Sequence, residues 1–321
     1  MKQRLVIGLI FVAGCGGGGV SIDKACGDLA SAVCNKRSTC SNGANIVKLF
    51  GSMANCLARE KLTCVNALGA PGNANSAANQ ELCATAWQGA TCVDFLLDNA
   101  PAQCVVNGAL AAGAACEYGG QCASSYCTNE KLAQCGSCGA PPAAGADCTT
   151  SGCARGQVCF ADSVANTMSC VVDGVSGGAC GRTAPCSPGL SCVGATATAD
   201  GTCMTAAISA GAACDNKSGP GCARDLGLFC NPSSATCTTV QYAADGAACG
   251  VTAGGDFVDC QQGTCFGSVG TTVMGTCKTN AADGAACDDV NGPSCTTPAR
   301  CVPVANGATS GTCYLPGTAS C

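Results

Sequence analysis

The sequence contains no histidine among its 321 residues. This absence excludes Ser-His-Asp and Cys-His nucleophilic catalysis, His-ligated zinc and His-ligated haem. Only 11% of the residues are charged, with 15 basic against 20 acidic side chains, which argues against nucleic-acid binding. Leu, Ile, Val and Phe together reach 16%, below the roughly 20% of an ordinary hydrophobic core. Most of the chain therefore needs another source of stability.

Cysteine is the residue that can supply this stability. The chain has 35 cysteines, about 11% of its length, which is above the band of about 8–10% that marks a disulfide scaffold. Cys15 lies at the end of a predicted export signal, so it is counted apart. The other 34 cysteines are an even number, which can close as 17 disulfides in an oxidising compartment. We therefore expect a small disulfide-rich fold: a helical cysteine-rich region followed by a tandem array of small β-hairpin and loop modules.

An export signal is expected at the start of the chain. Lys2 and Arg4 precede an apolar run over residues 5–12. This run is far shorter than the roughly 20 residues of a transmembrane helix. Residues 1–14 are therefore predicted to be a signal peptide.

Residues 12–15, Val-Ala-Gly-Cys, resemble the bacterial lipobox. The resemblance implies that Cys15 becomes the new N-terminus and carries lipid, so that the membrane is one expected partner. Residues 15–20 would form a Gly-rich tether to the folded body. In Gram-negative lipoproteins, a residue other than aspartate directly after the lipidated cysteine usually implies sorting to the outer membrane. Gly16 stands at that position, so the resemblance implies an outer-membrane protein that faces the periplasm or the cell surface. A plain signal peptide cleaved elsewhere is the alternative.

Residues 21–112 are predicted to be helical, because apolar side chains recur there at helical spacing. Helices are expected from Ile22 onward, with Ser21 or Asp23 as cap, over residues 46–68, around residues 82–87, and near residues 94–97.

Two of these helices each carry a pair of cysteines eight residues apart, which places both members on roughly one face. The pairs are Cys26 with Cys34 and Cys56 with Cys64. Antiparallel packing would form Cys26–Cys64 and Cys34–Cys56. The other cysteines of the region are then left for further bridges: Cys40, Cys83, Cys92 and Cys104.

Residues 113–321 form six tandem repeats. Each repeat opens with a glycine two or three residues before a cysteine, and the opening cysteines are 32, 32, 34, 35 and 38 residues apart. The predicted modules are module 1 (113–147), module 2 (148–179), module 3 (180–213), module 4 (214–248), module 5 (249–286) and module 6 (287–321). Because each would contact mainly its neighbours, we expect an elongated array.

Each module carries four cysteines, which two disulfides could staple in place of a core. They are Cys116, Cys122, Cys127 and Cys138; Cys148, Cys153, Cys159 and Cys170; Cys180, Cys186, Cys192 and Cys203; Cys214, Cys222, Cys230 and Cys237; Cys249, Cys260, Cys265 and Cys277; Cys287, Cys295, Cys301 and Cys313. First-to-third and second-to-fourth pairing is favoured among three possible connectivities. Cys135 and Cys321 fall outside this pattern. A bridge between them would bring the first and last modules together, whereas two free thiols would invite dimerisation.

Module 1 resembles the Dickkopf N-terminal cysteine-rich module. The resemblance rests on Gly113-x-x-Cys116-x5-Cys122-x4-Cys127, with Ser-Ser-Tyr before the third cysteine. It also extends to repeats of large bacterial cysteine-rich lipoproteins, covering residues 113–321 by spacing and residues 21–112 more loosely. Copies four to six stretch the gaps, and the adjacent cysteines of some Dickkopf modules are absent. The resemblance implies a bacterial surface or periplasmic lipoprotein, without the Wnt-related receptor binding of eukaryotic Dickkopf proteins.

These observations predict a non-enzymatic surface binding or structural protein with no cofactor, whose partner is an extracellular or periplasmic protein or glycan. One alternative is a thiol-redox protein, because Cys135 and Cys138 have the Cys-x-x-Cys spacing of dithiol oxidoreductases. A second alternative is thiolate metal binding, although the intervals between cysteines are looser than the usual zinc knuckles. No spacing nominates a pair of catalytic carboxylates.

Overall fold

The described N-terminal residues, from residue 19 to about residue 100, form a group of five α-helices, and apolar periodicity predicted this helical character. The computed structural model describes residues 19–128, 133–149, 151–162, 167–268, 273–288, 290–305, 308–317 and 321. The predicted signal peptide and Cys15 lie outside the described residues. The helices are α1 (Ile22–Cys40), α2 (Ala44–Phe50), α3 (Met53–Gly69), α4 (Ala77–Gly89) and α5 (Cys92–Leu96).

Four of these helices start at a hydroxyl residue that caps the first turn. The side chains of Ser21, Ser52, Ser76 and Thr91 each accept a hydrogen bond from the backbone N–H three residues later. A cap of this kind contributes about 1 kcal/mol. The single helix predicted over residues 46–68 was wrong. Gly51, at φ +73°, ends α2, and Ser52 starts α3 as a separate helix.

The helices are cross-linked by four disulfides. Cys26–Cys64 and Cys34–Cys56 join α1 to α3, with Cα–Cα distances of 5.4 and 6.0 Å, which confirms the pairing predicted from helix geometry. Cys40–Cys92 and Cys83–Cys104 tie in α5 and α4. The apolar core beside them contains Trp87 packed edge-on against Phe95, with ring centroids 5.3 Å apart.

The remainder of the described chain is built from short, mostly antiparallel strands in small sheets. The strands are β1 (Ala115–Cys116), β2 (Cys127–Thr128), β3 (Gly136–Cys138), β4 (Val158–Asp162), β5 (Thr167–Val171), β6 (Ala179–Cys180), β7 (Leu190–Val193), β8 (Gly201–Thr205), β9 (Leu228–Asn231), β10 (Thr236–Thr239), β11 (Gln241–Ala243), β12 (Ala248–Val251), β13 (Phe257–Cys260), β14 (Gly263–Phe266), β15 (Gly275–Thr279), β16 (Ala286–Asp288), β17 (Arg300–Pro303) and β18 (Ser310–Tyr314). Short 3-10 turns lie at η1 (Ala102–Cys104), η2 (Gly119–Gln121) and η3 (Arg224–Leu226).

The six modules share one topology. In modules 1, 3 and 6 the sheet orders are β1-β3-β2, β6-β8-β7 and β16-β18-β17, so the last strand lies in the middle. Modules 2 and 4 keep the hairpins β4-β5 and β9-β10, with isolated bridges in place of the opening strand. In module 5, β12 also pairs with β13, which pairs in parallel with β11 of the preceding module.

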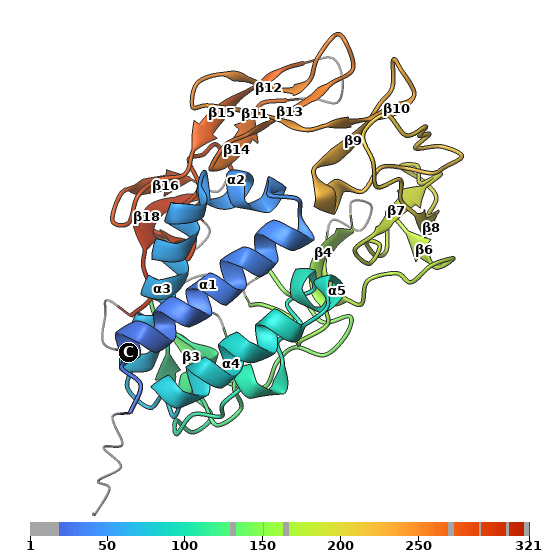
Figure 1. Cartoon of the computed structure of the whole chain (residues 1–321). Coiled ribbons are helices and arrows are strands. Elements are labelled where there is room, and N and C mark those ends of the chain that lie inside the picture. The colour runs from blue at the N-terminus through green and yellow to red at the C-terminus, as the bar shows by residue number, and fades with distance from the viewer. Residues whose placement is uncertain are drawn as a thin grey trace, which may run out of the picture.

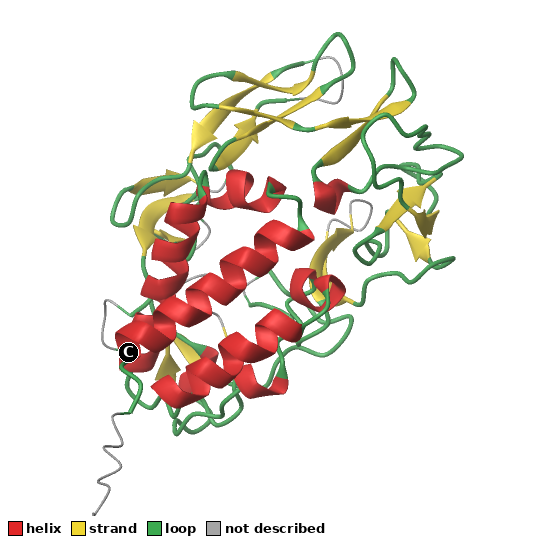
Figure 2. Cartoon of the chain, in the orientation of Figure 1, coloured by secondary structure: helices red, strands yellow, loops and turns green. Residues whose placement is uncertain are grey.

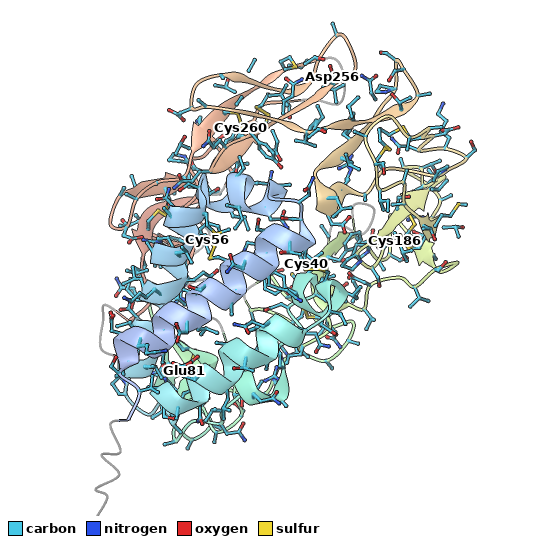
Figure 3. All side chains as sticks on the ribbon, viewed as in Figure 1. Cys40, Cys56, Glu81, Cys186, Asp256 and Cys260 are labelled. Atoms are coloured by element: carbon cyan, nitrogen blue, oxygen red, sulfur yellow. A yellow bond between two sulfur atoms is a disulfide. The ribbon has the colours of Figure 1, made fainter. Side chains whose placement is uncertain are left out.

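The disulfides of every module follow the predicted first-to-third and second-to-fourth pairing. The third and fourth cysteines lie opposite each other in the hairpin, as Cys265 does with Cys277, but each bonds back to an earlier cysteine. By loop-closure entropy a bridge spanning about 15 residues contributes roughly 3 kcal/mol. In modules 1, 4, 5 and 6 the buried cysteines form small cores. Disulfide sulfurs occur in both the helical and the strand regions (Figure 3).

The glycine that opens each module has a structural role. Gly246 adopts φ +75°, which L-residues with a Cβ rarely reach, and its N–H donates to the carbonyl of Cys277 at 2.8 Å. The same bond, at 2.7 or 2.8 Å, ties an opening glycine to the fourth cysteine in each of the other modules: Gly113, Gly145, Gly177, Gly211 and Gly284. The turn therefore fixes the start of each module against its last strand.

The modules do not form the elongated array that was expected. They curve past the helices from β4 through β7 and β9 to β12 and then β18 (Figures 1 and 2), and the Cys135–Cys321 bridge joins the first module to the last. The modules contact the helices directly: Lys48 of α2 pairs with Asp259 of module 5, and Arg59 of α3 pairs with Asp283 at the end of module 5. These ion pairs hold module 5 against the helices, in addition to its contacts with neighbouring modules.

Candidate functional site

The described cysteines all form disulfides, 17 in total. Cys135 bonds to Cys321, with a Cα–Cα distance of 5.7 Å, and Cys138 bonds to Cys122. The proposed redox pair is therefore not a disulfide in this structure, because its members belong to two different bridges. The thiol-redox alternative consequently loses the adjacent dithiol on which it rested.

The cysteines also bear on the metal alternative. Several sets of three sulfurs lie within 4.8 Å of one another, for example those of Cys116, Cys122 and Cys138. Each set contains sulfurs of the two crossed bridges of one module. A sulfur in a disulfide is not a thiolate, and the thiolate is the form that binds metal. These clusters are thus explained by the disulfide pattern.

The first and last modules meet at a polar contact that we call the closing junction: Glu117, Tyr118, Tyr314, Pro316 and Gly317. Glu117 is only 4% exposed, and its carboxylate accepts hydrogen bonds from the Tyr314 hydroxyl and, at 2.6 Å, from the Gly317 N–H. The Tyr118 hydroxyl donates to the Pro316 carbonyl at 2.7 Å. Burial, and secondarily the nearby charge of Glu117, raise the pKa of Tyr118, so its hydroxyl stays protonated as a donor.

Arg300 strengthens the closing junction beside the Cys135–Cys321 bridge. Its guanidinium lies over the Tyr314 ring, 5.4 Å from the centroid, and donates to the carbonyls of Ala133 and Gln134 at 3.3 and 2.8 Å. Cation–π and charge-assisted contacts of this kind favour one fixed arrangement of the two modules.

The helices contact module 6 as well. Both terminal nitrogens of Arg59 reach the carboxylate of Asp283, a residue of module 5, at 2.6 and 2.8 Å. The same guanidinium donates to the carbonyls of Thr296 and Thr297 at 3.0 and 2.8 Å. A planar guanidinium can satisfy all of these acceptors at once, which a lysine cannot do. The last module is thereby fixed to α3.

A charged cavity of about 540 Å³ lies among the helices. Its polar wall contains Arg37 of α1, Glu60 of α3 and Asp98 just after α5. Arg37 donates to Glu60 at 3.1 Å and lies over the rings of Phe50 and Phe95, 5.5 and 5.4 Å from their centroids.

The pKa values of both carboxylates in the charged cavity are raised. Burial raises the pKa of Glu60, and the attraction of Arg37 only partly offsets this rise. Asp98 is open to the solvent in the cavity, but the protein around it raises its pKa by desolvation, against the attraction of Arg37 and Arg155. The cavity therefore disfavours two negative charges beside one guanidinium.

Sequence reasoning missed these two carboxylates because nothing local connects them. Glu60 and Asp98 come from separate helical segments, and Cys40–Cys92 brings the end of α1 and the start of α5 together. A pattern search within one helix cannot detect residues that a distant disulfide juxtaposes.

The raised pKa of Glu60 predicts that the stability of the variant Glu60→Gln, relative to wild type, depends on pH. Below the ordinary pKa of 4.5, Glu60 is protonated in both states and resembles glutamine. At higher pH the unfolded chain ionises more readily than the folded protein, so wild-type unfolding free energy falls. We expect Glu60→Gln to become more stable relative to wild type between about pH 4 and pH 7, as measured by urea unfolding.

The surface variant Glu81→Gln serves as the control for that measurement, because Glu81 belongs to an exposed ion pair with Lys24. A wild-type advantage over Glu60→Gln that grows with pH would contradict the assigned direction of the Glu60 shift.

None of the described helices is both long enough and apolar enough to cross a membrane. Comparisons of the chain with protein-family models, with curated proteins and with solved structures find no match.

Proposed function

We propose that the protein is a lipid-anchored, extracytoplasmic, non-enzymatic scaffold whose rigid surface binds a protein or glycan partner. The observation that carries this proposal is the closed circuit of modules around the helices, fixed by the Cys135–Cys321 bridge. A surface held in one conformation loses little conformational entropy when a partner binds. Few contacts with that partner are then enough for specific binding.

The disulfides support the location in this proposal. Bridges persist in oxidising compartments and are rare where cellular thiols reduce them. The export pattern in residues 1–14 and the lipobox-like residues 12–15 agree with that compartment. Lipid on Cys15 would hold the scaffold at the outer membrane, with residues 15–20 as the tether.

The lipid anchor is tested by fractionating Gram-negative cells that express the full chain or the variant Cys15→Ser. We expect wild type in the outer-membrane fraction, with an intact mass that shows removal of residues 1–14 and acylation of Cys15. The variant should lose acylation and leave that fraction. An unacylated wild-type protein cleaved at another position would overturn the anchor.

The scaffold role has a separate test on the same purified protein. Without reductant, the described body should resist a broad-specificity protease, and any partner captured from the cell envelope should be retained. After reduction and alkylation of the cysteines, both properties should be lost together. Equal proteolysis before and after reduction would contradict a rigid disulfide scaffold.

A further inference from the structure

We propose that the charged cavity binds a small organic monocation, a primary amine or guanidinium compound with a compact apolar body. This site goes beyond the scaffold role and does not depend on the lipid anchor. Its volume of about 540 Å³ lies within the range of roughly 300–1,000 Å³ found for small-molecule sites.

The cavity is lined by both apolar and polar side chains, as in sites that hold a ligand body and orient its head group. We call the apolar lining, which includes Leu29, Trp87 and Phe95, its apolar wall, and the polar lining of Arg37, Asn45, Glu60, Gln80 and Asp98 its polar wall.

The charges of the polar wall favour a cation. Its two carboxylates face one guanidinium, which already bonds to Glu60 and lies over two aromatic rings. Among the described residues, none donates a hydrogen bond to the Asp98 carboxylate. Arg155 of module 2 attracts Asp98, but it is exposed and outside the cavity wall, where water and salt screen it. One positive charge is missing, and a ligand ammonium would supply it.

Gln80 is a second unmet polar group in the cavity. The residue is 7% exposed and lines the cavity, and no described residue hydrogen-bonds to its side-chain amide. The amide is therefore left to water or to a bound ligand. An N–H group of the ligand would be satisfied by the Gln80 carbonyl oxygen while the cation meets Asp98.

The same walls disfavour the other ligand classes. An anion would meet two carboxylates, and the one guanidinium already gives a terminal nitrogen to Glu60. A sugar ring would need an open aromatic face, but Trp87 and Phe95 are only 7% and 9% exposed. The cation is therefore the ligand charge that the cavity fits.

The test compares three probes with the same aromatic body: phenethylamine, 2-phenylethanol and phenylacetate. Binding to the oxidised full chain is measured by calorimetry and by NMR, with glucose as a fourth probe. We expect phenethylamine to bind at least ten-fold more tightly than the alcohol, and phenylacetate to bind more weakly still. Its affinity should rise with pH as Glu60 and Asp98 ionise, with Arg37 and Arg155 charged throughout.

Two variants locate the binding. Asp98→Asn should reduce phenethylamine affinity at least ten-fold, and because Asp98 is solvent-exposed, circular dichroism should confirm that this variant stays folded. Asp173→Asn is the matched control, since Asp173 lines the neighbouring groove instead; it should leave affinity unchanged. Equal binding of the three probes, tighter binding of glucose, or unchanged affinity in Asp98→Asn would overturn the proposal.

Discussion

Replacing both Cys135 and Cys321 with serine is expected to lower the urea midpoint of the protein substantially while every module keeps its own two disulfides. The bridge closes a sequence separation of 186 residues, which by loop-closure entropy alone corresponds to about 5 kcal/mol. The disulfides inside that loop already restrict the unfolded chain. We therefore expect a loss nearer to ~3 kcal/mol, measured by urea unfolding without reductant.

The matched control is the double variant Cys153→Ser with Cys170→Ser, which opens a bridge of separation 17 inside module 2. Hydrogen exchange should separate the two cases. Opening Cys135–Cys321 should accelerate exchange at the closing junction, in modules 1 and 6, whereas the control should act within module 2. A midpoint unaffected by the Cys135 and Cys321 replacements would mean that the bridge does not close the circuit.

Glu117→Ala is expected to give the second large loss, about 3 kcal/mol of unfolding free energy. The truncation removes the acceptor of the Tyr314 hydroxyl in a buried place and that of the Gly317 N–H at the exposed edge of the junction. A buried unsatisfied group costs about 1–3 kcal/mol, and a hydrogen bond to a charged group contributes about 1.5–3 kcal/mol. Tyr314→Phe removes one of the two donors, so it should cost less. Urea unfolding of the three proteins measures this order.

Glu81→Ala is the control for a lost carboxylate at the surface. Glu81 (labelled in Figure 3) pairs with the exposed Lys24 at 3.2 Å, and such pairs contribute about 0–1 kcal/mol. If Glu117→Ala lost no more stability than Glu81→Ala, the closing junction would not hold the first and last modules together.

The disulfide framework was largely predictable from sequence because its rules are local. Cysteines eight residues apart lie on one helix face, which led to Cys26–Cys64 and Cys34–Cys56. The four cysteines of each repeat allowed three connectivities, and the favoured first-to-third and second-to-fourth pairing is the one observed. The break at Gly51 was missed because apolar periodicity continues on both sides of it.

The closed arrangement could not be predicted in the same way. Arg59 and Asp283 are 224 residues apart. Whether they meet depends on how the five modules from residue 113 onward are arranged in space. Repeat spacing indicated neighbour contacts only, so it favoured an elongated array. The sequence did leave Cys135 and Cys321 as the two unmatched cysteines, which was the one sign of a long-range closure.

The charged cavity belongs to the same class of features. Its carboxylates, Glu60 and Asp98, are acceptable surface residues in their own segments, and only the helix packing around Cys40–Cys92 places them beside Arg37. The helical region therefore supplies both the central body that the modules contact and a cavity of its own.

The measurement that tests the closed circuit most directly is peptide mapping of the oxidised protein by mass spectrometry, with free thiols blocked before digestion and no reductant. The account predicts a peptide that joins Cys135 to Cys321, another that joins Cys122 to Cys138, and no blocked thiol among these four residues. A Cys135–Cys138 linkage, or Cys321 blocked as a free thiol or bonded to a second molecule, would contradict it.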